Sequence, residues 1–200
     1  ICGKFPRISP EAPVPVVLVE SESFMPGGAA NVANNISAMG GKVWLAGVVG
    51  SDHGGRLLKQ ELTSNGVDVE GIMDDSTRPT ILKTRIIAHH QQVVRVDREK
   101  LEKLNGALLN RLLRFIHKQL KNIDAVVIED YGKGVIMPEL LREILKEAKK
   151  NGVAVTVDPK EEHFSYYRGV TALTPNKFEA GGAVGIEIKD DRTLKKVGKK

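Results

Sequence analysis

Apolar and polar positions along the chain form two kinds of segment that alternate with each other. Short β-branched apolar runs, typical of strands buried on both faces, occur at residues 43–49, 123–128, 153–157 and 170–173. Longer segments that are helical in pattern lie at residues 29–39, 52–64, 108–120 and 138–151. This alternation predicts an open parallel α/β sheet that is covered by helices.

Residues with capping chemistry mark the ends of the predicted helices. Ser51 or Asp52 offers a side-chain oxygen to cap the second helix, and Asn65-Gly66 ends it. Pro138 lies in the first turn of the last helix, where its missing N–H leaves no hydrogen bond unmade. These signals support the helix boundaries that the apolar pattern indicates.

Two segments depart from the pattern and predict strands of a different kind. Polar and apolar positions interleave loosely in residues 14–20, and again on both sides of His89-His90. We predict a small antiparallel β-sheet lid, inserted in the main domain, with strands at about residues 10–25 and 80–97. The two histidines lie at the tip between two strands, and adjacent residues of a strand point to opposite sides, which argues against joint metal ligation.

Composition sets the class of protein. A chain of 200 residues with 41% hydrophobic content can bury one substantial core, and 28% charged residues is typical of a soluble domain. No apolar run reaches the roughly 20 residues that span a bilayer, and the apolar opening is too short for a secretory signal. We therefore expect a cytoplasmic protein without membrane contact.

The single cysteine, Cys2, excludes an internal disulfide framework.

The charge balance leaves two kinds of ligand to consider. The formal net charge is +5 and the pI is near 9.3, which suits either nucleic acid or an anionic small molecule. Aromatic residues make up only 4% of the chain, so few side chains are available to stack on bases. We therefore expect no nucleic-acid partner, and an anionic small substrate explains the mild basicity.

A glycine pair opens the first predicted helix. The sequence Pro-Gly-Gly-Ala-Ala-Asn at residues 26–31 lets the backbone at Gly27 and Gly28 approach a ligand next to a helix N-terminus. The amide of Asn31 can bond sugar hydroxyls. The alternative is a tight strand-to-helix turn in which Asn31 is a local cap.

Polar residues also follow three successive predicted strands. Asp130 and Lys133 come after the first, Lys160 after the second, and Thr-Pro-Asn at residues 174–176 after the third. In open α/β sheets, ligands bind outside the carboxyl ends of the strands, so these loops could hold a sugar phosphate in one crevice. Solvated loops without a ligand are the alternative.

Two further pairs each allow two interpretations. Asn176 and Glu179 suit a water-bound Mg²⁺ beside nucleotide phosphates, but the same spacing is a helix capping box. Arg95 and Asp97 on a lid strand are either a surface pair or reach from the lid into the crevice.

Together these motifs resemble those of the PfkB/ribokinase-type carbohydrate kinases. The glycine sequence at residues 26–31 looks like the N-terminal signature of that family, and residues 176–179 look like its Asn-x-x-Glu motif. Residues 7–16, 130–134, 157–160 and 173–176 further resemble the kinase domains that act on D-glycero-β-D-manno-heptose 7-phosphate. The resemblance covers nearly the whole chain.

The resemblance implies a Rossmann-like three-layer ribokinase fold with a β-lid, and a kinase that uses ATP and Mg²⁺. Its implied reaction transfers the γ-phosphoryl group to the anomeric hydroxyl of the heptose, and the product serves ADP-heptose and lipopolysaccharide core synthesis. It also implies a homodimer through the lid and, in many bacteria, a fused adenylyltransferase. The sugar-binding residues it suggests are Gly27, Gly28, Asn31 and Asp130, with Arg95, Lys133 and Lys160 for the 7-phosphate. Asn176 and Glu179 would organise Mg²⁺ and the ATP phosphates, with Glu179 as the metal ligand.

The sequence departs from the family pattern in two places. The catalytic Asp of a Gly-Ala-Gly-Asp motif is not found, so we expect it beyond Lys200 and assign no catalytic residue. The first sugar-binding strand of the family would precede Ile1. We therefore expect a partial kinase domain over residues 1–200, truncated at both ends and inactive by itself. Two alternatives stay open: another PfkB-type kinase, for fructose 6-phosphate or ribose, and a sugar-binding relative that has lost catalysis.

Overall fold

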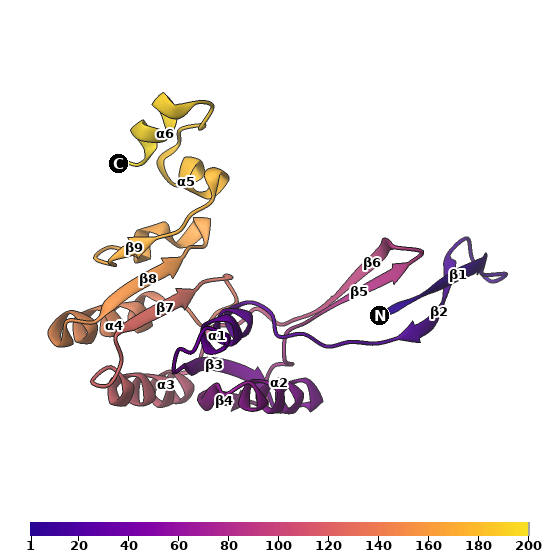
Figure 1. The fold of residues 1–200 in the computed structure, drawn as a ribbon, viewed down its shortest axis with the longest axis horizontal. Coiled ribbons are helices and arrows are strands. Elements are labelled where there is room, and N and C mark those ends of the chain that lie inside the picture. Colours follow the sequence, from indigo (N-terminus) through magenta and orange to yellow (C-terminus); the bar gives the residue numbers. More distant parts are fainter. Residues whose placement is uncertain (200) are drawn as a thin grey trace.

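The computed structural model describes residues 1–199 and contains the predicted parallel strands (Figure 1). Two parallel groups form the body: β3 (Trp44–Gly50) with β4 (Asp68–Asp75), and β7 (Ala125–Glu129) with β8 (Ala154–Asp158) and β9 (Ala172–Leu173). The prediction of parallel α/β structure is confirmed. The strands do not form one continuous sheet, because within residues 1–199 no pairing joins β3 to β7.

The predicted helices form at the expected places. They are α1 (Ala29–Ala38), α2 (His53–Ser64), α3 (Gly106–Gln119) and α4 (Pro138–Asn151). Asp52 is the N-cap of α2, and its side chain accepts a hydrogen bond of 3.0 Å from the Gly55 amide. Gly152 ends α4 in the left-handed conformation, with φ of 70°, as a glycine C-cap should.

Four elements of the body are not predicted by the sequence pattern: β4, the 3₁₀ helix η1 (Glu161–Tyr166), α5 (Lys177–Val184) as a complete helix, and α6 (Asp191–Val197). β4 was missed because it carries acidic residues at both ends and Gly71 in the middle. That glycine is required by packing, since a Cβ there would lie 2.5 Å from the Phe115 ring. Within residues 1–199, no helix combines the length and apolar character needed to span a membrane.

The core of the body lies between the strands and helices α3 and α4. Leu112, Leu140 and Leu141 are each 1% exposed and pack in one apolar cluster with residues of β7 and β8. A second cluster joins α1 and α2 to β3 and β4. The expectation that β7 is buried on both faces is wrong, because Val127 is 46% exposed. Its neighbours Val126 and Ile128 point to the other face, toward the cluster.

The lid is a mixed sheet that extends from the body as an arm (Figure 1). Its strand order is β2 (Pro15–Ser21), β1 (Cys2–Ile8), β5 (Leu82–Ala88) and β6 (Gln91–Arg98). The predicted hairpin is confirmed: β5 and β6 pair antiparallel, and His89 and His90 form the turn with φ of 49° and 65°.

Strand β1 lies outside the range predicted for the lid. It runs antiparallel to β2 and parallel to β5, so it joins the two predicted halves of the lid. Its pairing register shifts between Lys4 and Arg7, and Pro6 lies in that irregularity. A proline inside an apparent strand argues against one, and bulges are among the few places where a sheet accepts it. The sequence pattern therefore hid this strand.

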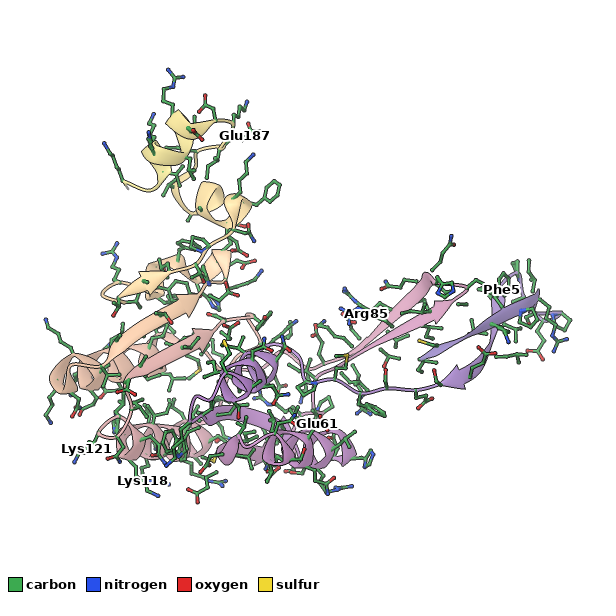
Figure 2. All side chains as sticks on the ribbon, in the orientation of Figure 1. Phe5, Glu61, Arg85, Lys118, Lys121 and Glu187 are labelled. Carbon is green, nitrogen blue, oxygen red and sulfur yellow. The ribbon has the colours of Figure 1, made fainter. Side chains whose placement is uncertain are left out.

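Most lid side chains are exposed. Every residue of β6 is exposed, and Figure 2 shows side chains such as Phe5 and Arg85 along the projecting arm. The exposed large apolar side chains in and directly beside the lid strands are Phe5, Ile8, Val14, Leu18, Val19, Ile81, Val93, Val94 and Val96. The lid is therefore held by its backbone ladder rather than by a core of its own.

A buried polar junction attaches the lid to the body. Thr80, just before β5, donates its hydroxyl to Asp52 Oδ1 at 2.7 Å, and its hydroxyl oxygen accepts from the Gly50 amide at 2.9 Å. The hydrogen bond from Thr80 is the main cause that lowers the pKa of Asp52 to about 2. Gly50 has no room for a side chain here, because a Cβ would lie 2.5 Å from the Thr80 nitrogen.

All strong chromophores of the described chain lie in the body. Trp44 is the first residue of β3, and the Lys42 ammonium lies 4.8 Å from its ring centroid. Tyr131 follows β7, and Tyr166 and Tyr167 lie at the end of η1. The lid strands contain neither tryptophan nor tyrosine.

Candidate functional site

The carboxyl ends of β7, β8 and β9 lie side by side, as the sequence predicts. Glu129 pairs with Asp158 across β7 and β8, and Val157 pairs with Leu173 across β8 and β9. Thr174 donates its hydroxyl to Asp158 Oδ1 at 3.3 Å, which links the last two loops. The polar residues that follow these strands therefore gather at one edge of the body.

The glycine loop before α1 packs against this edge. Gly28 has φ of 54°, and a Cβ at this position would lie 3.2 Å from the Tyr131 ring. The loop and the strand end therefore approach closely because residue 28 lacks a side chain. Gly28 is the N-cap of α1, and no side chain caps this helix, so the alternative that Asn31 is a local cap is wrong. Asn31 is exposed one turn into the helix.

The loops that carry the two predicted lysines, Lys133 and Lys160, lie close together in space, and each lysine has a carboxylate partner. Gly132 has φ of 64°, and the Lys160 side chain passes 3.4 Å from where its Cβ would be. Lys133 is paired with Glu99, which follows the lid strand β6, at 2.9 Å, and it lowers the pKa of that carboxyl. Lys160 pairs with Glu162 at 3.1 Å. Each ammonium group is therefore already paired with a carboxylate.

Asp130 is buried instead of facing the crevice. Its side chain is 1% exposed, and Oδ2 accepts a hydrogen bond of 2.7 Å from the Tyr167 hydroxyl and lies 2.7 Å from His163 Nδ1. Oδ1 accepts from the Gly132 amide at 2.8 Å. The expected direct contact between this carboxylate and a sugar is not available in this structure, because protein groups surround it. Asp130 instead shapes the loop that follows it.

Two carboxylates that are not among the predicted site residues lie at the same edge. Glu129 and Asp158 are the last residues of adjacent parallel strands. Burial, and then the nearby charge of Asp158, raise the pKa of Glu129. Burial and the Glu129 charge likewise raise the pKa of Tyr131. An acidic residue at the end of each apolar strand was the signal that could have found them.

The Asn176–Glu179 pair forms a complete capping box. Asn176 Oδ1 accepts from the amides of Phe178 and Glu179 at 2.9 and 3.0 Å, and Glu179 Oε2 accepts from the Asn176 amide at 2.8 Å. The capping interpretation is therefore confirmed for helix α5. The magnesium role of this pair stays a prediction. Within residues 1–199, no group of three or more His, Cys, Asp or Glu side chains is arranged to hold a metal ion.

Arg95 lies on the lid arm in a network of exposed ion pairs. It contacts Asp97 on its own strand at 2.9 Å and is 50% exposed. Asp97 also pairs with Lys83 across the hairpin at 2.8 Å, and this contact is the main cause that lowers the pKa of Asp97. The surface-pair interpretation therefore describes the present contacts of Arg95. Its predicted role at the substrate phosphate requires the arm to approach the strand ends.

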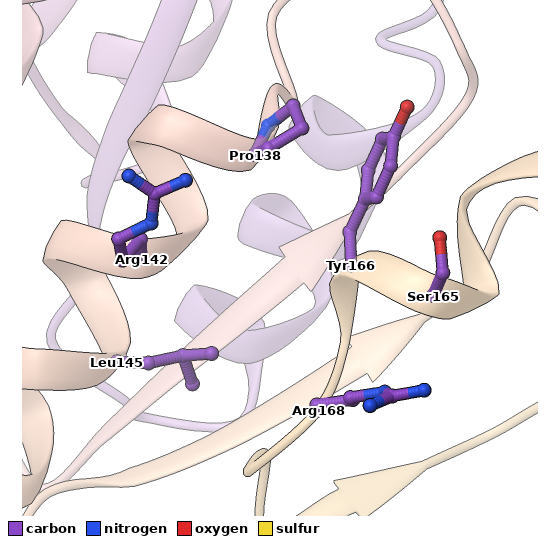
Figure 3. A pocket seen from close by; sticks show the side chains of 6 residues that line it. All are labelled: Pro138, Arg142, Leu145, Ser165, Tyr166 and Arg168. Carbon is purple, nitrogen blue, oxygen red and sulfur yellow. The ribbon is translucent and has the colours of Figure 1, made fainter.

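Two surface hollows contain none of the predicted site residues. A hollow of about 400 Å³ lies between α4 and the end of η1 (Figure 3), lined by Pro138, Arg142, Leu145, Ser165, Tyr166 and Arg168. In Figure 3 the two arginine side chains point away from each other, so they do not clamp one anion. A second hollow of about 350 Å³ borders α5 and includes Lys177 and Phe178.

Comparison with known proteins shows which family the chain belongs to. The profile of the family described as "pfkB family carbohydrate kinase" matches residues 4–200. The chain therefore belongs to the pfkB family of carbohydrate kinases, a family of transferases.

Its curated relatives narrow the resemblance. Over 198 residues the chain is 44% identical to the bifunctional protein HldE of Desulfatibacillum aliphaticivorans, covering 99% of this chain and 40% of that protein. It is 44% identical over 194 residues to HldE of Helicobacter pylori strain J99, covering 97% of this chain and 42% of that protein. The chain thus spans about two fifths of the length of the curated relatives that it matches.

Solved structures share the fold. Phosphofructokinase-2 from Escherichia coli, in complex with substrates and products, superposes with a TM-score of 0.74 at 22% identity, over 98% of this chain and 63% of that one. Arabidopsis thaliana ribokinase complexed with ribose and ATP gives 0.68 at 16% identity, over 99% of this chain and 64% of that one. The predicted ribokinase-type fold is confirmed.

Proposed function

We propose that this chain is the larger part of a kinase domain that phosphorylates D-glycero-D-manno-heptose 7-phosphate at its anomeric hydroxyl, with ATP as the phosphoryl donor. The product, heptose 1,7-bisphosphate, would serve ADP-heptose and lipopolysaccharide core synthesis. The observation that carries the proposal is that three loops lie in close contact: Gly28 approaches the Tyr131 ring, and Gly132 approaches the Lys160 side chain. The relatives named HldE support the choice of sugar.

Cationic and amide groups at the strand ends suit a phosphorylated sugar. Asn31 and the backbone at Gly27 and Gly28, at the N-terminus of α1, would contact the sugar hydroxyls. Lys133 and Lys160 would receive the 7-phosphate, which would compete with Glu99 and Glu162 for the two ammonium groups. Arg95 would join them from the lid. Asp130 would act by holding the Lys133 loop.

Acidic groups at the same edge fit a magnesium ion. Mg²⁺ is usually held by one or two carboxylates together with substrate phosphates. Glu179 uses Oε2 in the capping box, and Glu129 with Asp158 forms a like-charged pair that a cation would stabilise. We propose that Asn176, Glu179 and Asp158 organise Mg²⁺ and the ATP phosphates, where the ion would neutralise charge on the phosphates. The proton acceptor for the sugar hydroxyl is expected beyond Lys200.

The exposed apolar side chains of the lid suit a second copy of the chain. Leu18 on β2 and Val94 and Val96 on β6 are all exposed, and exposed apolar surface often marks a protein–protein interface. We propose a homodimer that pairs lid with lid, and a fused adenylyltransferase in the complete protein, as the relatives described as bifunctional suggest.

The test is ADP release by the complete gene product, with heptose 7-phosphate, fructose 6-phosphate and ribose offered in parallel. Turnover confined to heptose 7-phosphate is expected. A preference for another sugar would keep the kinase and reject the heptose, and no turnover with any sugar would favour a binding protein. Residues 1–200 alone should give no turnover.

Two variants of the complete protein assign the roles. Lys133→Ala should raise KM for the sugar phosphate by about tenfold, as expected for one lost charge-assisted hydrogen bond, and Asn176→Ala should mainly lower kcat. Lys146→Ala is the matched control, because its ammonium is equally charged but lies exposed on α4. An unchanged KM in the Lys133 variant would remove that residue from the phosphate site.

A further inference from the structure

The hydroxyl of Tyr167 joins two of the strand-end loops. It donates a hydrogen bond to Asp130 Oδ2 at 2.7 Å, and its oxygen accepts one from the Lys160 amide at 3.0 Å. Asp130 begins the loop after β7, and Lys160 ends the loop after β8. Tyr167 is 2% exposed, so water does not compete for either bond. One buried oxygen thus fixes both loops to η1.

The imidazole of His163 reinforces the same carboxylate. Its Nδ1 lies 2.7 Å from Asp130 Oδ2, and because a carboxylate only accepts, the ring donates this bond. The ring also stacks on Tyr166, with centroids 4.7 Å apart. The His163 amide in turn donates to the Lys160 carbonyl at 2.9 Å. His163 therefore also contacts both loops, from one residue of η1.

These hydrogen bonds set the positions of the two loops that carry the predicted phosphate-binding lysines. Asp130 Oδ1 accepts from the Gly132 amide, so the carboxylate sets the turn that carries Lys133. Gly132 has φ of 64° and lies against the Lys160 side chain. A shift of either loop would change the separation of the two ammonium groups.

We propose that His163 and Tyr167 are positioning residues that hold the loops of Lys133 and Lys160 at the spacing required to bind the phosphate of the sugar substrate. This inference rests on the proposed function and deepens it, because it assigns part of the affinity for the phosphate to two residues that do not touch it. Neither residue belongs to the sequence motifs that pointed to the site.

The experiment uses the complete gene product and two kinds of substitution. Tyr167→Phe keeps the ring and removes the shared oxygen, and His163→Phe keeps a stacking ring and removes the donor. Each should raise KM for heptose 7-phosphate by about tenfold, with kcat changed less than threefold and KM for ATP unchanged. His163→Asn, which can still donate from a nitrogen close to the position of Nδ1, should restore most of the affinity.

Tyr166→Phe is the matched control. It removes a neighbouring hydroxyl for which the structure gives no hydrogen bond within residues 1–199, and it keeps the ring that stacks on His163. Its kinetic constants should equal those of the wild type. A KM in Tyr167→Phe that matches this control would overturn the positioning role, as would equal losses of kcat and of affinity for both substrates.

A second measurement separates this inference from the proposed function. Amide hydrogen exchange without any substrate should become at least tenfold faster at Lys160 in Tyr167→Phe, and at Gly132 in His163→Phe. If the wild type phosphorylates none of the sugars, the proposed function fails, and the exchange rates still report on the two loops. Unchanged exchange at both amides would refute the loop fixation itself.

Discussion

The strand-end region of the body and the lid arm are built in opposite ways. In the body, His163 and Tyr167 both donate hydrogen bonds to the buried carboxylate of Asp130, next to a leucine-rich core. In the lid, every residue of β6 is exposed and the charged side chains pair in water. Buried hydrogen bonds fix the geometry of the groups that they join. Exposed ion pairs contribute little to the free energy of unfolding, because water competes for the same groups.

This difference indicates that the two regions offer different kinds of surface to a ligand or partner. The body supplies loops whose positions are set before a ligand arrives. The lid supplies exposed apolar side chains and exposed charged side chains that pair with one another. A buried polar junction through Thr80 and Asp52 joins the two regions just before β5. Substitutions of the same type should therefore have unequal effects in the two regions.

The largest difference should come from the same leucine truncation made in each region. Leu141→Ala, at a side chain that is 1% exposed, should lower the free energy of unfolding by about 2–5 kcal/mol through lost contacts and a cavity. Leu18→Ala, in the lid at 57% exposure, should change it by less than about 0.5 kcal/mol. Urea unfolding followed by circular dichroism measures both. Equal losses would contradict the distinction between the two regions.

The junction gives the next largest effect. Thr80→Val keeps the shape, removes the donor to Asp52 and leaves the Gly50 amide unpaired, so it should cost about 1–3 kcal/mol of unfolding free energy at pH 7.

The effect of Thr80→Val on the free energy of unfolding should also depend on pH. The folded pKa of Asp52, about 2, lies below its ordinary value of 3.8, so the stability it contributes is present above about pH 4 and is lost as pH falls toward 2. The difference between wild type and Thr80→Val should shrink over that interval. A constant difference would show that the hydrogen bond does not depend on the charge of Asp52.

Self-association should respond to a charge placed on the lid face. Leu18→Glu should weaken the lid-to-lid dimer by at least tenfold, or about 1.4 kcal/mol, while the fold is kept. Leu194→Glu is the control, because this leucine is similarly exposed, at 51%, but lies on α6. Sedimentation velocity over a concentration series measures both. A dimer that withstands the lid charge would refute the lid interface.

The smallest effect should come from an exposed ion pair of the lid. Lys4 contacts Glu20 across β1 and β2 at 2.6 Å, but the two side chains are 67% and 51% exposed. Lys4→Ala should leave the thermal midpoint unchanged within error, because water replaces the contact. A clear drop would mean that the lid depends on its surface charges.

The sequence predicted the elements that have strong local signals. Asp52 and Pro138 located two helix starts, and His89-His90 located the hairpin turn, because each residue type suits the backbone conformation that it adopts. β1 and β4 were missed, since their strand character depends on neighbours in space. Pro6 is tolerated by a register shift, and Gly71 by the approach of Phe115.

The candidate site was predicted in its loops but not in its contacts. The order of apolar strands and polar loops was enough to bring Lys133 and Lys160 to one edge. It could not show that Asp130 is buried, because burial of a carboxylate depends on the donors that surround it. His163 and Tyr167, which supply those donors, lie more than 30 residues further along the chain and carry no local signal.

The placement of the chromophores has a consequence for spectroscopy. With Trp44 on β3 and all three tyrosines in the body, intrinsic fluorescence and near-ultraviolet absorption of residues 1–199 report on the body alone. A lid that detached or unfolded would leave these signals almost constant. An optical melting curve would then describe the body only, and a tryptophan introduced at Phe5, in β1, would make the lid visible as well.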